Sequence, residues 1–339
     1  MKCNTTIRFL RDIADIQTGP FGSQLHKEDY VEYGTPIVTV EHLGNRKFTE
    51  QNLPKVSDSD KERLKKYVLA TGDIVFSRVG SVDRCSYVDE EHNGWMFSGR
   101  CLRVRPSENI DSLYLYYYFC REETRQFVRN IAVGATMPSI NTKLLGEVPV
   151  AVPDLQIQKM VSNILSTIDN KIELNNKINA NLQQQAQAIF KSWFVDFEPF
   201  QNGEFVESEL GPIPKGWRVG TLSELVAVKY GKDHKKLTDG PYPVYGSGGI
   251  MRYVERPIYT KESVLIPRKG TLNNVIYLNE PFWSVDTMFY TEMKMENVAK
   301  YVYHFVSGKD LASMNSGSAV PSMTTDILQS IQVVVPTAE

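Results

Sequence analysis

The sequence predicts an α+β protein in which two similar mixed α/β domains are separated by one long coiled-coil-type helix. Residues 154–197 contain no Gly or Pro and repeat apolar residues at steps of four and three, the pattern of a long amphipathic helix. On both sides of this stretch, short β-type runs alternate with Gly, Pro and Asn turns. Segments of the first region recur in the same order in the second, which indicates an internal duplication.

The composition is that of an ordinary globular protein with room for two or three domains. The 339 residues are 42% apolar and 23% charged with a formal net charge of −2, so any contact with nucleic acid needs local basic patches. Cys3, Cys85, Cys101 and Cys120 show no C-x-x-C spacing, and the five histidines are scattered, so we expect reduced thiols and no metal site. No apolar run approaches the roughly 18 residues that span a bilayer, and a soluble cytoplasmic protein without membrane contact is expected.

Residues 1–153 are predicted to form the first domain. Its strand-like runs cover residues 35–40, 73–78 and 101–105, and a helix is predicted over 110–128. That helix carries the run LYLYYYF. We interpret its tyrosines as core residues, and the alternative is a platform on which bases stack.

The predicted helix region, residues 154–200, is the organising element of the chain. At about 1.5 Å per residue the apolar pattern would extend roughly 60 Å, which is long for a helix inside one compact domain. A core helix of a helical domain is the alternative. Residues 201–216 are rich in Pro, Gly and Glu and are predicted to be a linker, and residues 217–336 form the second domain.

Four matches support the duplication. They superpose Arg78 on Arg268, Gly80 on Gly270 and Tyr87 on Tyr277. The matched segments, in the same order in both domains, are 10–19 with 222–231, 72–88 with 262–278, Tyr117 and Phe119 with Tyr303 and Phe305, and 134–153 with 317–336. Two related but distinguishable binding sites are expected, because loops diverge while a scaffold persists.

In each domain a strand ends in Arg-x-Gly-Ser/Thr, and a polar loop follows the first strand. An Arg beside a Gly turn and a hydroxyl suits DNA phosphate or the guanine edge, and Asn suits the adenine edge. A turn-capping Arg, turn-forming Asn residues and a solvated loop are the alternatives. The predicted DNA-binding residues are Gly22, Ser23, Gln24, Ser77, Arg78, Gly80, Ser81, Lys232, Lys235, Lys236, Gly246, Ser247, Arg268, Lys269, Thr271, Asn273 and Asn274.

Signatures of catalysis are sparse, and no catalytic residue is predicted. The chain has no G-x-x-x-x-G-K-S/T loop and no N-P-P-F/Y motif. Asp286, Glu292 and Lys294 loosely follow the D…E-x-K pattern of metal-dependent nucleases, which gives an enzyme as one alternative. A strand with alternating surface charges is the simpler interpretation. A coiled-coil interaction protein without a DNA role is a further alternative.

The chain resembles the specificity subunit of a type I restriction–modification system over essentially its whole length. The resemblance is carried by GPFGSQLHKEDYVEYGTPIVTVEHL, by the helix that ends in IFKSWFVDFEPF, and by YPVYGSGGIM and VLIPRKGTLNNVIYLNEPFWSVDT. It implies that residues 1–153 and 217–336 are target recognition domains, each recognising one half of a split sequence in double-stranded DNA.

The resemblance also implies partners. The long helix would set the spacing between the half-sites and bind the modification (methyltransferase) subunits, through which the restriction subunits attach. S-adenosylmethionine, ATP and Mg²⁺ would be bound by those partners, and this chain would not be catalytic. The residues expected at the subunit interface are Ile164, Ile168, Ile172, Ile178, Leu182, Phe190, Trp193 and Phe194.

The family pattern includes a second helix after the second recognition domain. By the repeat, Pro336 corresponds to Pro153, so residues 337–339 would begin that helix, and the sequence ends at Glu339. We therefore expect the first helix to pair with another chain, by self-association or with the modification subunits.

Overall fold

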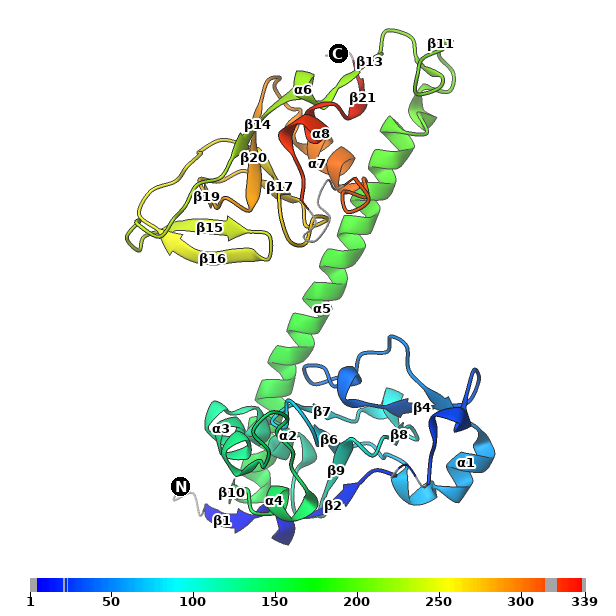
Figure 1. The fold of residues 1–339 in the computed structure, drawn as a ribbon, viewed down its shortest axis with the longest axis vertical. Coiled ribbons are helices and arrows are strands. Elements are labelled where there is room, and N and C mark those ends of the chain that lie inside the picture. The colour runs from blue at the N-terminus through cyan, green and yellow to red at the C-terminus, as the bar shows by residue number, and fades with distance from the viewer. Residues whose placement is uncertain (1–4, 21, 23, 315–321, 337–339) are drawn as a thin grey trace. The chain divides into compact units, whose positions relative to one another are not determined.

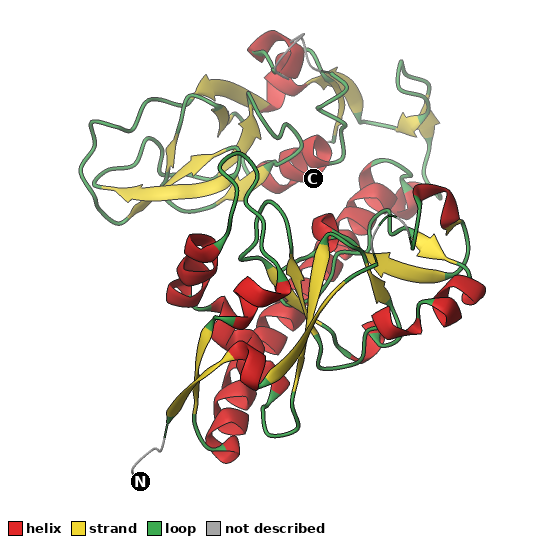
Figure 2. Cartoon of the chain, turned by 60° about the horizontal axis from the view of Figure 1, so that its bottom comes forward, coloured by secondary structure: helices red, strands yellow, loops and turns green. Residues whose placement is uncertain are grey.

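The computed structural model describes residues 5–20, 22, 24–314 and 322–336. It has two compact units, Met1–Asn175 and Asn176–Glu339, and helix α5 (Leu155–Phe194) is continuous across the boundary between them. Both units contain sheets and helices (Figure 2). The predicted α+β class, with a long helix between two mixed domains, is therefore confirmed.

The first unit contains two four-stranded sheets, with strand orders β2-β9-β6-β7 and β3-β5-β4-β8, and a separate β1–β10 pair (Figure 1). Its elements are β1 (Thr6–Phe9), β2 (Ala14–Thr18), β3 (Tyr30–Val31), β4 (Thr35–Val38), β5 (Lys55–Val56), α1 (Asp58–Arg63), β6 (Ile74–Ser77), β7 (Cys85–Tyr87), β8 (Met96–Phe97), β9 (Cys101–Pro106), α2 (Ser112–Cys120), α3 (Glu122–Ile131), α4 (Thr142–Gly146) and β10 (Pro149–Val152).

Strand β6 belongs to two hydrophobic cores at once. Ile74 and Phe76 pack with α2 and α4 in one core, whereas Val75 packs with the β4–β8 strands in the other. Because successive side chains of a strand point to opposite faces, a strand covered on both faces is apolar without alternation. This explains why the β6 residues in the run 73–78 do not alternate between apolar and exposed polar side chains.

The second unit repeats this plan, with a four-stranded sheet of order β14-β20-β17-β18, a three-stranded sheet β16-β15-β19 and a β13–β21 pair. Its elements are β11 (Phe205–Val206), β12 (Ile213–Pro214), β13 (Arg218–Thr221), α6 (Leu222–Leu225), β14 (Val226–Tyr230), β15 (Tyr242–Gly246), β16 (Gly249–Val254), β17 (Ser263–Pro267), β18 (Ile276–Leu278), β19 (Trp283–Ser284), β20 (Met288–Met293), α7 (Ala299–Ser307), α8 (Thr325–Gln329) and β21 (Gln332–Val335).

Strand pairings support the duplication independently of the sequence match. In the first unit β4 runs parallel to β8, and in the second β15 runs parallel to β19. The terminal pairs also correspond, since Ile7 faces Ala151 and Val219 faces Val334. Part of the last predicted match, residues 317–321, lies outside the described residues.

The helix predicted over 110–128 is two helices, α2 and α3. Arg121 between them has an extended backbone with ψ 138°, and this interrupts the hydrogen-bond ladder. The interpretation of the tyrosines as packing residues is confirmed, because Tyr116 is buried and Tyr114 Oη donates to the Ala151 carbonyl at 2.7 Å. In the second unit, Tyr301 Oη donates to the Val334 carbonyl in the same way.

The segment predicted as a linker, residues 201–216, is more ordered than expected. It holds the antiparallel β11–β12 hairpin. Around this hairpin, aromatic side chains form a separate small core with strands of the second unit. Its members are Phe197, Phe200, Phe205, Ile213, Trp217, Val219 and Val334. The segment therefore belongs to the second unit as folded structure.

Helix α5 carries an exposed apolar stripe. Six of the residues predicted to contact other subunits have 46–56% of their surface exposed: Ile164, Ile168, Ile172, Ile178, Leu182 and Trp193. Although α5 is long, none of the helices that the structure describes is apolar enough along its length to cross a membrane.

The other two predicted interface residues lie against their own chain. Phe190 is buried, with its ring 5.4 Å from that of Tyr301, and the Phe194 ring lies 5.0 Å from the same tyrosine. Phe190 therefore stabilises the second unit, and the prediction that it contacts another subunit does not fit its burial.

Candidate nucleic-acid interface

The two arginines of the repeated motif occupy equivalent positions. Each follows a central strand, β6 or β17. Its Nη1 donates to a carbonyl of the loop that precedes the neighbouring strand of the same sheet, β9 or β20. Arg78 donates to Gly99 O, and Arg268 donates to Asp286 O, both at 3.1 Å. The Arg268 guanidinium also lies 5.3 Å from the centre of the Tyr230 ring. Each arginine thus ties its own loop to a second loop, which agrees with the alternative interpretation of a turn-capping arginine.

The glycines of the motif are explained by backbone conformation. Gly80 and Gly270 have φ values of 77° and 84°, in the left-handed region that favours glycine. A Cβ on Gly80 would meet no atom within 4 Å. The turn geometry therefore accounts for glycine here without requiring a close approach of DNA.

Two of the predicted contacts are buried. The Ser77 side chain is fully buried, and its Oγ donates to Val79 O at 2.7 Å. Gly246 lies under Met251, whose Sδ would be 2.7 Å from a Cβ at that position. Neither residue can reach DNA as placed here, and both instead shape the turns beside them.

In the first unit a groove of about 870 Å³ opens beside the Arg78 loop. The sequence predicted Gly22, which lines this groove, but not Arg84 and Arg100, which also line it. The match of 72–88 with 262–278 superposes Arg84 on Asn274 and was the signal that could have identified it. The other lining residues are Pro20, Leu25, Tyr30, Thr39, Val40, Glu41, Ser98 and Gly99.

One wall of this groove is held by a buried histidine. The Nδ1 atom of His42 accepts from the Thr39 backbone N–H at 3.1 Å, while its Nε2 lies 3.1 Å from Gln51 O. Since Nδ1 accepts, Nε2 carries the proton and donates to that carbonyl. The neutral tautomer therefore orients Thr39 at the groove.

The predicted residues that remain in the first unit lie on two of its loops. The Gln24 side chain accepts a hydrogen bond from Tyr67 Oη at 2.7 Å and so helps to fix the loop. Ser23 lies outside the described residues. Ser81 and Gly80 are exposed at the turn beside Arg78, where the sequence predicted them.

The second unit brings most of its predicted residues to one place. Asn274 Nδ2 donates to Ser247 O at 2.7 Å, and a Cβ on Gly270 would lie 3.0 Å from Ser247 Oγ. Lys232 joins them through its backbone, which donates to Ser284 O at 2.8 Å and accepts from Trp283 Nε1 at 2.9 Å. The loops that follow β14, β15 and β17 carry the predicted residues, and these contacts bring them toward one end of the unit.

The asparagines have structural roles in this arrangement. Besides the bond from Asn274 to Ser247, the Asn273 Oδ1 accepts from the Ala312 N–H at 3.2 Å. Their side chains tie loops together, which favours the turn alternative over adenine contacts. The exposed residues that remain for DNA in this unit are Lys232, Lys235, Lys236, Lys269 and Thr271.

The acidic residues of the nuclease alternative do not form one site. Asp286 precedes β20, whereas Glu292 and Lys294 lie at the other end of that strand. Glu292 pairs with Lys229 at 3.6 Å, and Lys294 Nζ donates to Ser223 O. Within the described ranges there is no cluster of His, Cys, Asp or Glu side chains suited to a metal ion.

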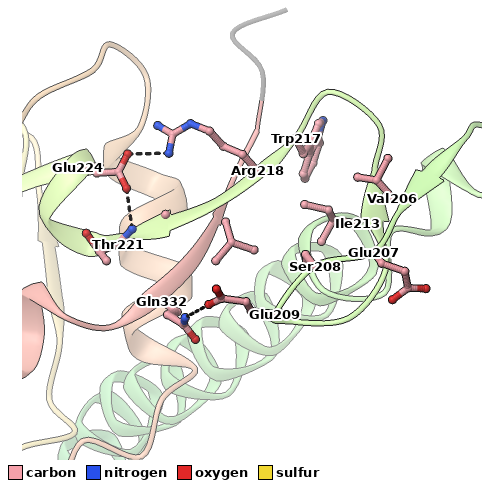
Figure 3. A pocket seen from close by; sticks show the side chains of 12 residues that line it. Val206, Glu207, Ser208, Glu209, Ile213, Trp217, Arg218, Thr221, Glu224 and Gln332 are labelled. Atoms are coloured by element: carbon pink, nitrogen blue, oxygen red, sulfur yellow. Dashed lines mark hydrogen bonds and ion pairs between the residues drawn. The ribbon is translucent and has the colours of Figure 1, made fainter.

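Another cavity of the second unit has the opposite charge character. It measures about 540 Å³ and lies between the β11–β12 hairpin and β13. Glu207, Glu209 and Glu224 line it with one guanidinium, that of Arg218 (Figure 3). Glu224 pairs with Arg218 at 2.6 Å, and Glu209 accepts from Gln332. Carboxylates repel phosphate, so this cavity is a poor place for DNA.

Comparisons with known proteins agree with the duplicated fold. A family model described as the type I restriction modification DNA specificity domain matches residues 4–184 and 214–339. The solved S subunit of a type I restriction-modification system from M. genitalium shares the fold, with a TM-score of 0.64 at 18% identity over 98% of this chain and 85% of that one.

Curated relatives carry the same description. The type I restriction enzyme MjaIX specificity subunit of Methanocaldococcus jannaschii is 28% identical over 231 residues, 67% of this chain and 52% of the relative. The HindI specificity subunit of Haemophilus influenzae is 32% identical over 159 residues, 46% and 34% of the two chains. The matched part thus spans about half the length of the MjaIX subunit and about a third of the HindI subunit. Because the family model matches both halves, the chain belongs to the family of type I restriction modification DNA specificity domains.

Proposed function

We propose that this protein is the DNA sequence-specificity subunit of a type I restriction–modification complex. The observation that carries the proposal is the double match of the DNA specificity domain to the two halves of the chain. Each unit then recognises one half of a bipartite target in double-stranded DNA. The alternative of a coiled-coil protein without a DNA role has no such support.

The loops give this function a physical basis. In the first unit Arg84 and Arg100 line the groove, and in the second Lys232, Lys235, Lys236 and Lys269 are exposed on the loops that carry the predicted residues. Cations of this kind neutralise phosphates and release counterions, which supplies affinity. Base identity is then distinguished by side chains of the loops that differ between the units.

Partner subunits supply the chemistry in this proposal. The exposed stripe of α5 binds modification subunits, and restriction subunits join the complex through them. S-adenosylmethionine serves methyl transfer on the modification subunits, and ATP and Mg²⁺ serve the restriction subunits. The chain itself contributes recognition, so it is not catalytic.

Co-expression with the cognate modification subunit, followed by genome-wide mapping of methylated bases, tests the proposal. We expect methylation at one asymmetric sequence whose two specified halves are separated by unspecified bases. Substitution of both Arg84 and Arg100 by Gln should abolish methylation. Methylation at a single continuous sequence, or none when the complex assembles, would contradict the proposal.

A further inference from the structure

The β15–β16 hairpin of the second unit presents apolar side chains to solvent at the predicted DNA interface. Ile250 and Met251 are 52% and 59% exposed, and they lie at the start of β16, just after the turn at 247–248. Tyr253 on the same strand is 51% exposed. Exposed apolar side chains grouped on one strand generally mark a binding surface.

The hairpin is built so that both of these side chains point outward. Tyr245 pairs with Ile250 and Val244 with Arg252, so the register shifts by one residue at Met251. Such a bulge re-aims a side chain at the cost of local pairing. Met251 then covers Gly246, and β16 is an edge strand of its sheet as far as the described residues go.

The hairpin tip meets the basic loops. Ser247 at the turn accepts the Asn274 hydrogen bond, and Asn274 belongs to the loop that follows Arg268 and Lys269. Lys232 and Lys269 are both exposed. The tip therefore combines an apolar pair with flanking cations. Of the partners that such a surface fits, DNA offers both phosphates and the apolar thymine methyl group.

Among its described residues, the first unit has no tight hairpin at this place. Its parallel strand β4 is followed by the short 3-10 turn Val40–His42, and the antiparallel partner of β4 is β5, further along the chain. The shared scaffold thus carries a different structure in each unit at the same place. An element that differs on a common scaffold is where half-site specificity is expected.

We propose that the β15–β16 hairpin enters the major groove of one half-site, where Ile250 and Met251 contact thymine C5-methyl groups. A two-stranded ribbon fits that groove, and the thymine methyl distinguishes its base pair there. The inference rests on the proposed function and adds which residues of the second unit contact bases and which base group they recognise. Lys232 and Lys269 hold the phosphates on either side of the ribbon.

The test uses the full chain in complex with its modification subunits and duplexes that carry the mapped target. Replacing thymine by deoxyuridine in one half-site removes only the methyl groups. Wild type should bind such a duplex about fourfold more weakly for each contacted methyl in the half-site that the second unit recognises. The double variant Ile250→Ala/Met251→Ala should bind the thymine duplex more weakly and ignore the deoxyuridine replacement.

The matched control is Met295→Ala, which removes an exposed methionine elsewhere in the same unit. It should retain the deoxyuridine effect in full. A double variant that remains as sensitive to deoxyuridine as wild type would overturn the inference, as would target halves without thymine. Loss of modification-subunit binding would assign the hairpin to a protein partner and equally overturn it. A wild-type complex without sequence-specific binding would instead overturn the proposed function itself.

Discussion

At the scale of single residues, the interface separates side chains that hold loops from side chains that face solvent. Arg78 and Arg268 each donate to a loop carbonyl, and Asn274 donates to Ser247 O. Lys232 and Lys269 are exposed beside them. Substitutions in the first group should disturb loop geometry and stability together, whereas the second group should affect binding alone.

Lys269→Gln tests the second group. If the ammonium neutralises one phosphate, affinity should fall to a similar degree for specific and unspecific duplexes. The slope of log affinity against log salt should decrease in magnitude by about 1. Fluorescence anisotropy of the assembled complex between low and moderate salt measures both. Lys261→Gln removes an exposed lysine elsewhere in the unit and should leave the slope unchanged. An unchanged slope for Lys269→Gln would exclude a phosphate contact.

A thiol pair in the first unit gives a second prediction at this scale. Hydrogen bonds from Cys85 and Tyr116 and the charge of Arg125, partly opposed by burial, lower the pKa of Cys120 to about 6. The hydrogen bond to Cys120 raises the pKa of the Cys85 thiol. Because the folded pKa of Cys120 is depressed, its thiolate persists above about pH 6 and is protonated below it. Burial raises the pKa of Cys101 to about 12.

Iodoacetamide labelling across pH, followed by peptide mass spectrometry, checks this. Cys120 should label with a midpoint near pH 6, because only the thiolate reacts. Arg125→Gln should move that midpoint upward, while buried Cys101 serves as an internal control and stays unlabelled at neutral pH. A Cys120 midpoint near that of a free thiol would show that these hydrogen bonds and the charge of Arg125 do not lower its pKa.

At the scale of elements, the sequence was informative where one pattern decided the structure. Apolar residues at steps of four and three, in a stretch without Gly or Pro, predicted α5, and apolar runs between turns predicted β4, β6 and β9. Composition misled at residues 201–216, because Pro and Gly suggested a linker while the contacts of Phe205, Ile213 and Trp217 are tertiary. Aromatic residues at irregular spacing show no period, so only the folded structure reveals that they meet.

Helix α2 shows a related limit. The sequence match superposed Tyr117 on Tyr303. In the structure, Tyr114 is instead the counterpart of Tyr301, because each donates a hydrogen bond to the last strand of its own unit, β10 or β21. The buried residues agree, since Leu115 corresponds to Val302 and Phe119 to Val306. The correct match is therefore shifted by one residue. A run of tyrosines aligns equally well in several registers, and burial selects among them.

The site was predictable in position but only partly in role. The repeat located both Arg-x-Gly loops, and the one in the second unit does meet the Ser247 turn. It could not show that Ser77 is buried or that Asn273 bonds to Ala312, because these depend on contacts between segments far apart in the sequence. Arg100 was missed because it lies outside every repeated segment.

Trp217→Ala tests the folded hairpin segment. The indole packs against Phe200, with ring centres 4.9 Å apart, and against Phe197 at 5.6 Å. Its removal should destabilise the second unit by about 2–4 kcal/mol, since Trp217 is partly buried in a small core. Urea unfolding followed by circular dichroism measures the change. Trp193→Ala removes an indole that is 48% exposed and should cost much less. Equal losses for both variants would contradict the packing role of Trp217.

At the scale of the whole molecule, helix α5 is held by both units at separate places. In the first unit Tyr117 Oη donates to Asp169 and Arg46 donates to Asn170. In the second, Gln187 Nε2 donates to His304 O, and Phe190 packs beside it. Residues 174–185 between these anchors are exposed. A change of length there alters neither set of contacts.

Four residues inserted after Asn175 therefore test whether α5 sets the half-site spacing. At 1.5 Å and 100° per residue, the insertion lengthens the helix by about 6 Å and adds a net turn of about 40°. Because each base pair advances about 3.4 Å, the mapped target should keep both halves and gain roughly two base pairs between them. The matched control replaces residues 176–179 by alanine without changing the length, and its spacer should stay as in wild type. Two base pairs contribute roughly 70° in the same sense, so the complex must twist by about 30° to accommodate the insertion. An unchanged spacer in the insertion variant would mean that the units find their half-sites independently of helix length.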